Sequence, residues 1–185
     1  WLGAAALAGA TIVGINPTRG PADMAADIRH ADCQLLITDA ARLPLLQNLD
    51  TGVAPDRILC TDSPEYAAAL AAHRSEPAVA AGAGPESLLL LLFTSGTTGT
   101  SKAVRCTQGR LARIAAAAVE KYGHVRADVD YCCMPLFHGN AIMALWAPAL
   151  AIGATVCLTP SFSASGFLPD VRHFGATFFT YVGKA

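Results

Sequence analysis

The chain has 185 residues, of which 53% are hydrophobic and 15% are charged, and its formal net charge at pH 7 is −1. This balance excludes a disordered acidic or basic tail, because such tails carry many charges of one sign and few apolar residues. It also argues against a nucleic-acid partner, which would need a cluster of lysines and arginines. The length is sufficient for one domain with a hydrophobic core.

The first part of the sequence alternates short apolar runs with helical patterns. Helices are predicted at residues 1–10 and 21–31, and the second begins at a proline, which suits the first turn of a helix. Asp39 is predicted to cap a third helix, and either Asp62 or Ser63 to cap a fourth. Strands are predicted at residues 11–15, 33–38 and 57–60. This alternation is typical of a mostly parallel sheet with right-handed crossovers.

Residues 75–87 are rich in alanine, glycine and proline, and this composition predicts a linker. We treat the range as a candidate boundary between two subdomains of one large domain. Five consecutive leucines, Leu88–Leu92, come directly after it. An apolar run of this length, bounded by glycines and hydroxyl residues, is typical of a buried parallel strand.

The segment Phe93–Lys102 follows the leucines and combines two glycines and several hydroxyl side chains with a terminal lysine. Glycines let backbone N–H groups converge, hydroxyls add donors, and lysine adds a positive charge, so this combination can bind an anion such as a nucleotide triphosphate. Segments of this composition also form flexible linkers, but linkers rarely follow a buried strand directly. The spacing excludes a Walker A loop, because Ser101 and Ala103 flank the lysine, and no dinucleotide-binding G-x-G-x-x-G occurs.

The rest of the sequence continues the alternation of strands and helices. Thr107 is predicted to cap a long helix at residues 108–122, whose apolar residues recur at helical spacing. A strand at residues 130–134 ends in Pro135–Gly139, and ligands of open α/β sheets bind at such carboxyl ends. On composition alone, His138 is better interpreted as a surface-loop residue that caps the helix that follows. The other predicted elements are a strand at 104–106, a helix at 140–152, a strand at 154–158, a helix at 163–174 and a strand at 177–181.

Two stretches, residues 1–18 and 131–169, contain no Asp, Glu, Lys or Arg. Prolines and glycines interrupt both, and no basic region precedes the first, so we interpret them as core elements rather than as membrane spans or a signal peptide. The six cysteines show no C-x-x-C spacing, which argues against a zinc site and favours a reducing compartment. The predicted location is cytoplasmic, with peripheral membrane association left open.

Phe93–Gly99 resembles the phosphate-binding motif of the adenylate-forming enzymes, the superfamily of acyl-CoA synthetases, luciferases and peptide-synthetase adenylation domains. The usual motif continues with any residue and then Pro-Lys-Gly, from which this chain departs at Ser101 and Ala103. Met134–His138 resembles a second core motif of the superfamily, of the form Pro-Leu-aromatic-His. Residues 14–20 resemble a further family element, to which we assign no catalytic role. Residues 162–171 and 180–183 are similar to the fatty-acid transport protein branch, the very-long-chain acyl-CoA synthetases.

The resemblance implies an α/β fold of largely parallel sheets flanked by helices, with residues 1–185 forming part of the large N-terminal AMP-binding (adenylation) domain. It implies a fatty-acid–CoA ligase, which uses ATP and Mg²⁺ to convert a carboxylic acid to an acyl-adenylate and then forms acyl-CoA with CoA as co-substrate. The implied ATP phosphate-binding residues are Thr94, Ser95, Gly96, Thr97, Thr98, Gly99 and Lys102. Phe137, His138 and Gly139 are implied to line the acyl pocket.

Parts of the family's machinery are missing from this sequence. No aromatic-Gly-x-Thr-Glu motif occurs, so the usual Mg²⁺-binding glutamate is absent and the metal ligand is unknown. The family's C-terminal catalytic lysine should lie beyond Ala185, and we therefore expect residues 1–185 alone to be inactive. Two alternatives stay open: a non-catalytic nucleotide- or acyl-binding module, and an adenylating enzyme for aryl or amino acids. His30, His73, His124 and His173 are interpreted as structural or solvated.

Overall fold

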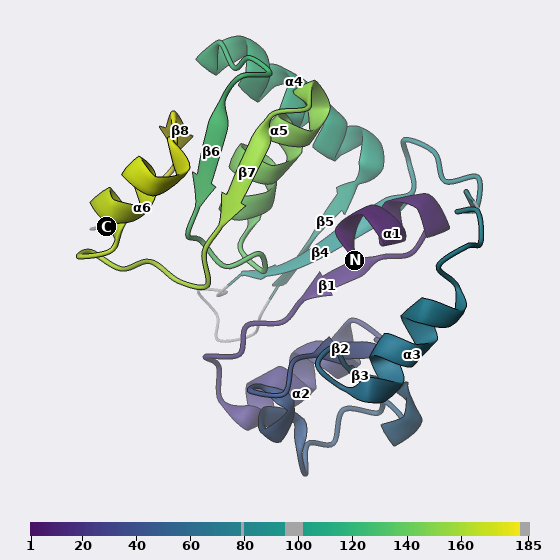
Figure 1. The fold of residues 1–185 in the computed structure, drawn as a ribbon. Coiled ribbons are helices and arrows are strands. Elements are labelled where there is room, and N and C mark those ends of the chain that lie inside the picture. Colours follow the sequence, from purple (N-terminus) through teal and green to yellow (C-terminus); the bar gives the residue numbers. More distant parts are fainter. Residues whose placement is uncertain (79, 95–101, 182–185) are drawn as a thin grey trace.

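The computed structural model describes residues 1–78, 80–94 and 102–181 (Figure 1). The predicted α/β fold is confirmed: within these residues, helices alternate with strands that form three small sheets, ordered β1-β4-β5, β2-β3 and β7-β6-β8. The strands are β1 Ile12–Gly14, β2 Leu36–Thr38, β3 Ile58–Cys60, β4 Leu88–Thr94, β5 Lys102–Thr107, β6 Val129–Cys132, β7 Thr155–Leu158 and β8 Phe178–Phe179. The α-helices are α1 Leu2–Ala8, α2 Pro21–His30, α3 Pro64–Ala72, α4 Gln108–Tyr122, α5 Ala147–Ile152 and α6 Phe167–Phe174.

The leucine run forms β4, the central strand of the first sheet. It pairs in parallel with β1 and antiparallel with β5, so the prediction of a parallel strand is correct on one side only. The antiparallel pairing of β4 with β5 follows from the short connection between these two strands. Parallel neighbours need a crossover of about a dozen residues or more, whereas the short segment 95–101 separates β4 from β5. The strand pairs of the other two sheets are parallel.

The main hydrophobic core lies between the first sheet, α4 and the helical segment that precedes and includes α5. Its buried side chains come from α1, β4, β5, α4 and the helical segment 141–152. They are Ala5, Leu89, Leu90, Leu92, Cys106, Leu111, Ala115, Ile142 and Ala147. A second cluster joins Cys132 of β6 to Ala141 and Leu145 of the same helical segment. Residues 141–152 therefore pack against both the first and the third sheet, and Figure 1 shows these sheets on either side of the helices.

The helix predicted at residues 140–152 is present but not uniform. Ala141–Trp146 is a π-helix, and α5 continues from Ala147. The change occurs just before Pro148, which has no N–H to donate to the carbonyl four residues earlier. A break in the i→i−4 pattern is therefore expected at this point, although the sequence analysis did not predict it.

Predicted helix caps are partly confirmed. The hydroxyl of Thr107 accepts the N–H of Arg110 at 3.2 Å, and α4 ends at Tyr122 as predicted. Ser63, rather than Asp62, caps α3. The prediction for Asp39 is wrong: its carboxylate accepts the N–H of Arg42 at 2.8 Å in a turn. Only a short 3₁₀-helix, Leu43–Leu46, follows that turn, and its proline suits the start of such a helix.

Several predicted elements are shorter in the structure. The strand predicted at 33–38 begins at Leu36, and the strand predicted at 177–181 is reduced to β8. The helix predicted at 163–174 begins at Phe167, because residues 163–166 form a turn in which the hydroxyl of Ser163 accepts the N–H of Gly166 at 3.1 Å.

Residues 75–87 contain no helix or strand among those that the structure describes, as the linker prediction expects. In the sequence, β1 lies before this segment and β4 lies after it. Because the two strands pair, the first sheet contains strands from both sides of the candidate boundary. The subdomain boundary at 75–87 stays a prediction. Within the described ranges, no helix is long and apolar enough to cross a membrane.

Candidate functional site

The candidate phosphate site lies where β4 ends and β5 begins. Thr94 and Lys102 are opposite each other in the antiparallel pair, and the Thr94 hydroxyl donates to the Lys102 carbonyl at 3.4 Å. Both residues are exposed, so both side chains are open to a ligand. The other predicted phosphate-binding residues, Ser95, Gly96, Thr97, Thr98 and Gly99, lie outside the described residues.

Strand geometry determines the face of the sheet on which these two side chains lie. Side chains alternate between the two faces of a strand, so Thr94 shares a face with Leu92, two residues earlier. Lys102 is opposite Thr94 and therefore lies on the same face. Leu92 belongs to the core that packs on α4 and α5. The hydroxyl and the ammonium group thus extend from the helix-facing side of the sheet, at its open end.

The second predicted segment, Phe137–Gly139, lies close to the same strand ends. A Cβ atom added to Gly14, at the end of β1, would lie 3.0 Å from the Phe137 Cα atom, and one added to Gly139 would lie 3.3 Å from the Leu92 Cδ1 atom. Leu92 is two residues before Thr94. The structure therefore brings together the described parts of the two motifs, which are more than 30 residues apart in the sequence.

Backbone hydrogen bonds shape this second segment into a turn that leads into the helix. The His138 N–H donates to the Pro135 carbonyl at 2.9 Å, and the Ala141 N–H donates to the His138 carbonyl at 3.1 Å. The rings of Phe137 and His138 are tilted against each other with centroids 4.5 Å apart. Phe137 is half-buried and His138 is exposed, so the imidazole is accessible to a substrate.

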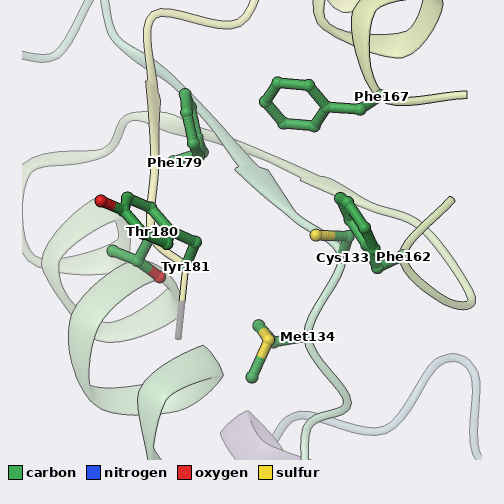
Figure 2. Close-up of a pocket in the computed structure, with 7 residues that line it drawn as sticks. All are labelled: Cys133, Met134, Phe162, Phe167, Phe179, Thr180 and Tyr181. Carbon is green, nitrogen blue, oxygen red and sulfur yellow. The ribbon is translucent and has the colours of Figure 1, made fainter. Parts of the chain in front are cut away.

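An apolar cavity of about 350 Å³ lies beyond this turn, between the carboxyl end of β6 and the end of β8 (Figure 2). Its lining residues are Cys133, Met134, Phe162, Phe167, Phe179, Thr180 and Tyr181. Met134 is three residues before Phe137, but none of the three predicted acyl-pocket residues is among the described residues that line the cavity. Burial raises the pKa of the Cys133 thiol, so this side chain is neutral at physiological pH.

A hydrogen bond at one edge of this cavity could not be predicted from the sequence. The Thr180 hydroxyl donates to the Asn140 side-chain oxygen at 2.5 Å, which ties the end of β8 to the start of the helical segment. The two residues are 40 positions apart. No local pattern indicates such a contact, although Asn140 lies in the helix predicted at 140–152 and Thr180 in the strand predicted at 177–181.

Two buried titratable side chains lie near the amino end of β6. His124 and Asp130 are buried, with 3.7 Å between the imidazole Nδ1 and the carboxylate Oδ1. Neither side chain has a hydrogen-bond partner in the described part of the chain. Burial raises the pKa of Asp130 to about 6; His124 opposes this rise and the nearby Asp128 adds to it. The imidazole packs edge-on against Phe178 at 4.2 Å between ring centroids, which fits the structural role expected for His124.

Metal ligands are not apparent at either end of β6. Across residues 1–78, 80–94 and 102–181, no group of three or more His, Cys, Asp or Glu side chains could hold a metal ion. Mg²⁺ prefers carboxylate, phosphate and water oxygens. The described part of the site offers the Thr94 hydroxyl but no carboxylate cluster, so we assign no metal ligand to it.

Comparisons with known proteins agree with the motifs. A family model described as "AMP-binding enzyme" matches residues 1–185. Steroid-22-oyl-CoA synthetase from Rhodococcus jostii (strain RHA1) is 68% identical over 186 residues, covering 100% of this chain and 34% of the relative. The medium/long-chain-fatty-acid–CoA ligase FadD17 from Mycobacterium marinum is 41% identical over 183 residues, covering 99% of this chain and 35% of the relative. This chain therefore spans about a third of the length of these relatives.

The similarity extends to the transport-protein branch and to solved structures. Long-chain fatty acid transport protein 5 from Homo sapiens is 31% identical, covering 100% of this chain and 28% of that protein. The o-succinylbenzoate-CoA synthetase MenE from Bacillus subtilis, in complex with ATP and a magnesium ion, superimposes with a TM-score of 0.75. At 22% identity, over 96% of this chain and 35% of that one, this likeness supports the fold alone.

Proposed function

This chain belongs to the family of AMP-binding enzymes, and on that premise we propose that the full-length protein is an AMP-forming acyl-CoA ligase. A carboxylate oxygen of the acid attacks the α-phosphorus of ATP, the bond to the bridging oxygen breaks, and pyrophosphate leaves. The thiol of CoA then attacks the acyl carbon, loses its proton, and releases AMP. The observation that carries the proposal is the close approach of Phe137–Gly139 to the ends of β1 and β4, since β4 ends at Thr94, opposite Lys102.

The first step requires two reactants to be held close together and negative charge to be stabilised on the phosphates. In the proposal, the Lys102 ammonium makes a charge-assisted contact with the phosphates, and the Thr94 hydroxyl donates a hydrogen bond to them. Ser95, Gly96, Thr97, Thr98 and Gly99 complete this phosphate site. Mg²⁺ bound with ATP neutralises part of the phosphate charge.

The acid side of the site is assigned to Phe137, His138 and Gly139. In the proposal, the half-buried Phe137 and the exposed His138 lie beside the acid as it approaches the phosphates. The neighbouring cavity is lined by four aromatic rings, which supports an acid with a large apolar body. Because a relative at 68% identity is named steroid-22-oyl-CoA synthetase, a steroid-22-oic acid is the first proposed substrate, and a long-chain fatty acid is the second.

The proposed partners are small molecules: ATP, the acid and CoA. Each of the six cysteines is a free thiol, which supports the proposal of a reducing compartment such as the cytoplasm. Residues 1–185 alone are expected to form no acyl-adenylate.

AMP release by the full-length protein tests the proposal. The acids to compare are a steroid-22-oic acid, a medium-chain and a long-chain fatty acid, benzoate and an amino acid, each with and without CoA. We expect continuous AMP release only with an apolar acid and CoA together. Release with benzoate or an amino acid alone would favour an adenylating enzyme for those acids. ATP binding without AMP release from any acid would favour a non-catalytic binding module.

A further inference from the structure

Gly14, the last residue of β1, lies against the backbone of the acid-binding segment. In the sheet it is opposite Leu92 of β4. A Cβ atom at Gly14 would lie 3.0 Å from the Cα atom of Phe137, 3.1 Å from its Cβ atom and 3.3 Å from its carbonyl oxygen. Two of these three atoms belong to the backbone, so rotation of a side chain cannot relieve the contact.

Gly139 makes a related but weaker contact from the other side. A Cβ atom there would lie 3.3 Å from the Leu92 Cδ1 atom, at the flexible end of that side chain. The two glycines together let Phe137–Gly139 lie directly on the ends of β1 and β4. Their missing side chains thus determine how close this segment lies to Thr94, where the phosphate loop begins.

We propose that Gly14 is a positioning residue, which with Gly139 sets the separation between the acid carboxylate and the phosphates of ATP. This inference rests on the proposed function. Its physical basis is steric, because the φ angle of Gly14 lies outside the left-handed region and alanine fits its backbone conformation. An added methyl group must move the Phe137 backbone away from β1, and the acid moves with it.

Such a displacement affects the reaction more than it affects ATP binding. The 3.0 Å contact requires the Phe137 backbone to shift by a few tenths of an ångström. Because misplacing a reacting group by about 1 Å can lower the rate by about 100-fold, this shift is expected to lower it by about 3- to 10-fold. Thr94 and Lys102 are not part of the Gly14 contact, so the phosphate site remains. The expected signature is a lower kcat for adenylate formation at an unchanged dissociation constant for ATP.

The test compares Gly14→Ala with Gly20→Ala in the full-length protein. Gly20 is the matched control, because its φ is −60° and a Cβ atom there meets nothing within 4 Å. Acid-dependent exchange of labelled pyrophosphate into ATP gives kcat, and calorimetry without acid gives the ATP dissociation constant. We expect Gly14→Ala to lower kcat by about 3- to 10-fold with ATP affinity unchanged, and Gly20→Ala to match the wild type. A Gly14→Ala variant with wild-type kcat would overturn the inference.

A second pair of variants keeps the inference testable if Gly14→Ala does not fold. Gly139→Ala is expected to lower kcat by a few-fold, and adding Leu92→Val should restore much of it, because valine lacks the Cδ1 atom that the new methyl group would meet. No loss from Gly139→Ala, or no recovery in the double variant, would contradict the inference. A wild-type protein that exchanges pyrophosphate with no acid would instead contradict the proposed function itself.

Discussion

The central strands of the first and third sheets, β4 and β6, occupy equivalent positions but have different interiors. Each lies between two neighbouring strands, and each leads into a segment proposed to bind substrate. The buried part of β4 is apolar, with Leu90 fully buried, whereas β6 carries a fully buried carboxylate, Asp130. Of the two strands, only β4 is therefore stabilised by apolar burial alone. The stability of the β6 region should depend on pH, and that of the β4 region should not.

The largest expected effect comes from the apolar interior of β4. Leu90→Ala leaves a cavity in the main core and should lower the free energy of unfolding by about 3–4 kcal/mol, equally at pH 5 and pH 8. Chemical denaturation of the full-length protein measures this loss. Leu70→Ala, at an exposed position on α3, is the matched control and should cost less than about 1 kcal/mol. A loss for Leu90→Ala that changes with pH would remove the contrast between the two strands.

A smaller, pH-dependent effect is expected at Asp130 in β6. Because its folded-state pKa of about 6 lies above the usual 3.8, the folded protein binds this proton more tightly than the unfolded chain. The stability contributed by the proton is present below about pH 4 and is lost as pH rises through 6. Between pH 5 and pH 8, the wild type should therefore lose about 1–2 kcal/mol of unfolding free energy relative to the Asp130→Asn variant.

Asp128→Asn provides the control for this pH dependence. The Asp128 carboxylate accepts the N–H of Val125 and the hydroxyl of Thr177, each at 2.8 Å, and these hydrogen bonds lower its pKa. Stability from such a group is present above its unfolded pKa and is lost only in acid. The difference in unfolding free energy between Asp128→Asn and the wild type should thus stay nearly constant from pH 5 to pH 8. A constant difference for Asp130→Asn as well would contradict a raised pKa at Asp130.

The smallest expected effect comes from the N-cap of α4, the helix that follows the first sheet in the sequence. Thr107→Ala removes the oxygen that accepts the Arg110 N–H, and it should lower the free energy of unfolding by about 1 kcal/mol. Thr107→Ser keeps the oxygen and should retain most of the stability. Equal losses in the two variants would show that the cap contributes nothing. Denaturation at a single pH is sufficient here, because no titrating group takes part.

Local sequence signals predicted much of the fold. The leucine run gave β4, and the hydroxyl of Thr107 followed by a helical apolar pattern gave α4 with its correct end. Both signals lie within a few residues of the element that they predict. The turn Pro135–Gly139 was likewise placed at the end of a strand, as the structure has it.

Features that depend on distant contacts could not be predicted in this way. The approach of Gly14 to Phe137 joins residues more than 100 positions apart, and the His124 ring packs against Phe178, more than 50 positions away. In each case tertiary packing, rather than local preference, determines the geometry.

The central claim is that the end of β4 and the start of β5 bind the phosphates of ATP through Lys102. Its most direct test is acid-dependent exchange of labelled pyrophosphate into ATP by the full-length Lys102→Ala variant. Arg105→Ala is the matched control, since Arg105 is an exposed cation on the same strand, and strand alternation places it on the opposite face. We predict that Lys102→Ala lowers kcat/KM for ATP by about 100-fold or more, while Arg105→Ala stays within about threefold of the wild type. An unchanged kcat/KM for ATP in the Lys102→Ala variant would show that Lys102 does not bind the phosphates.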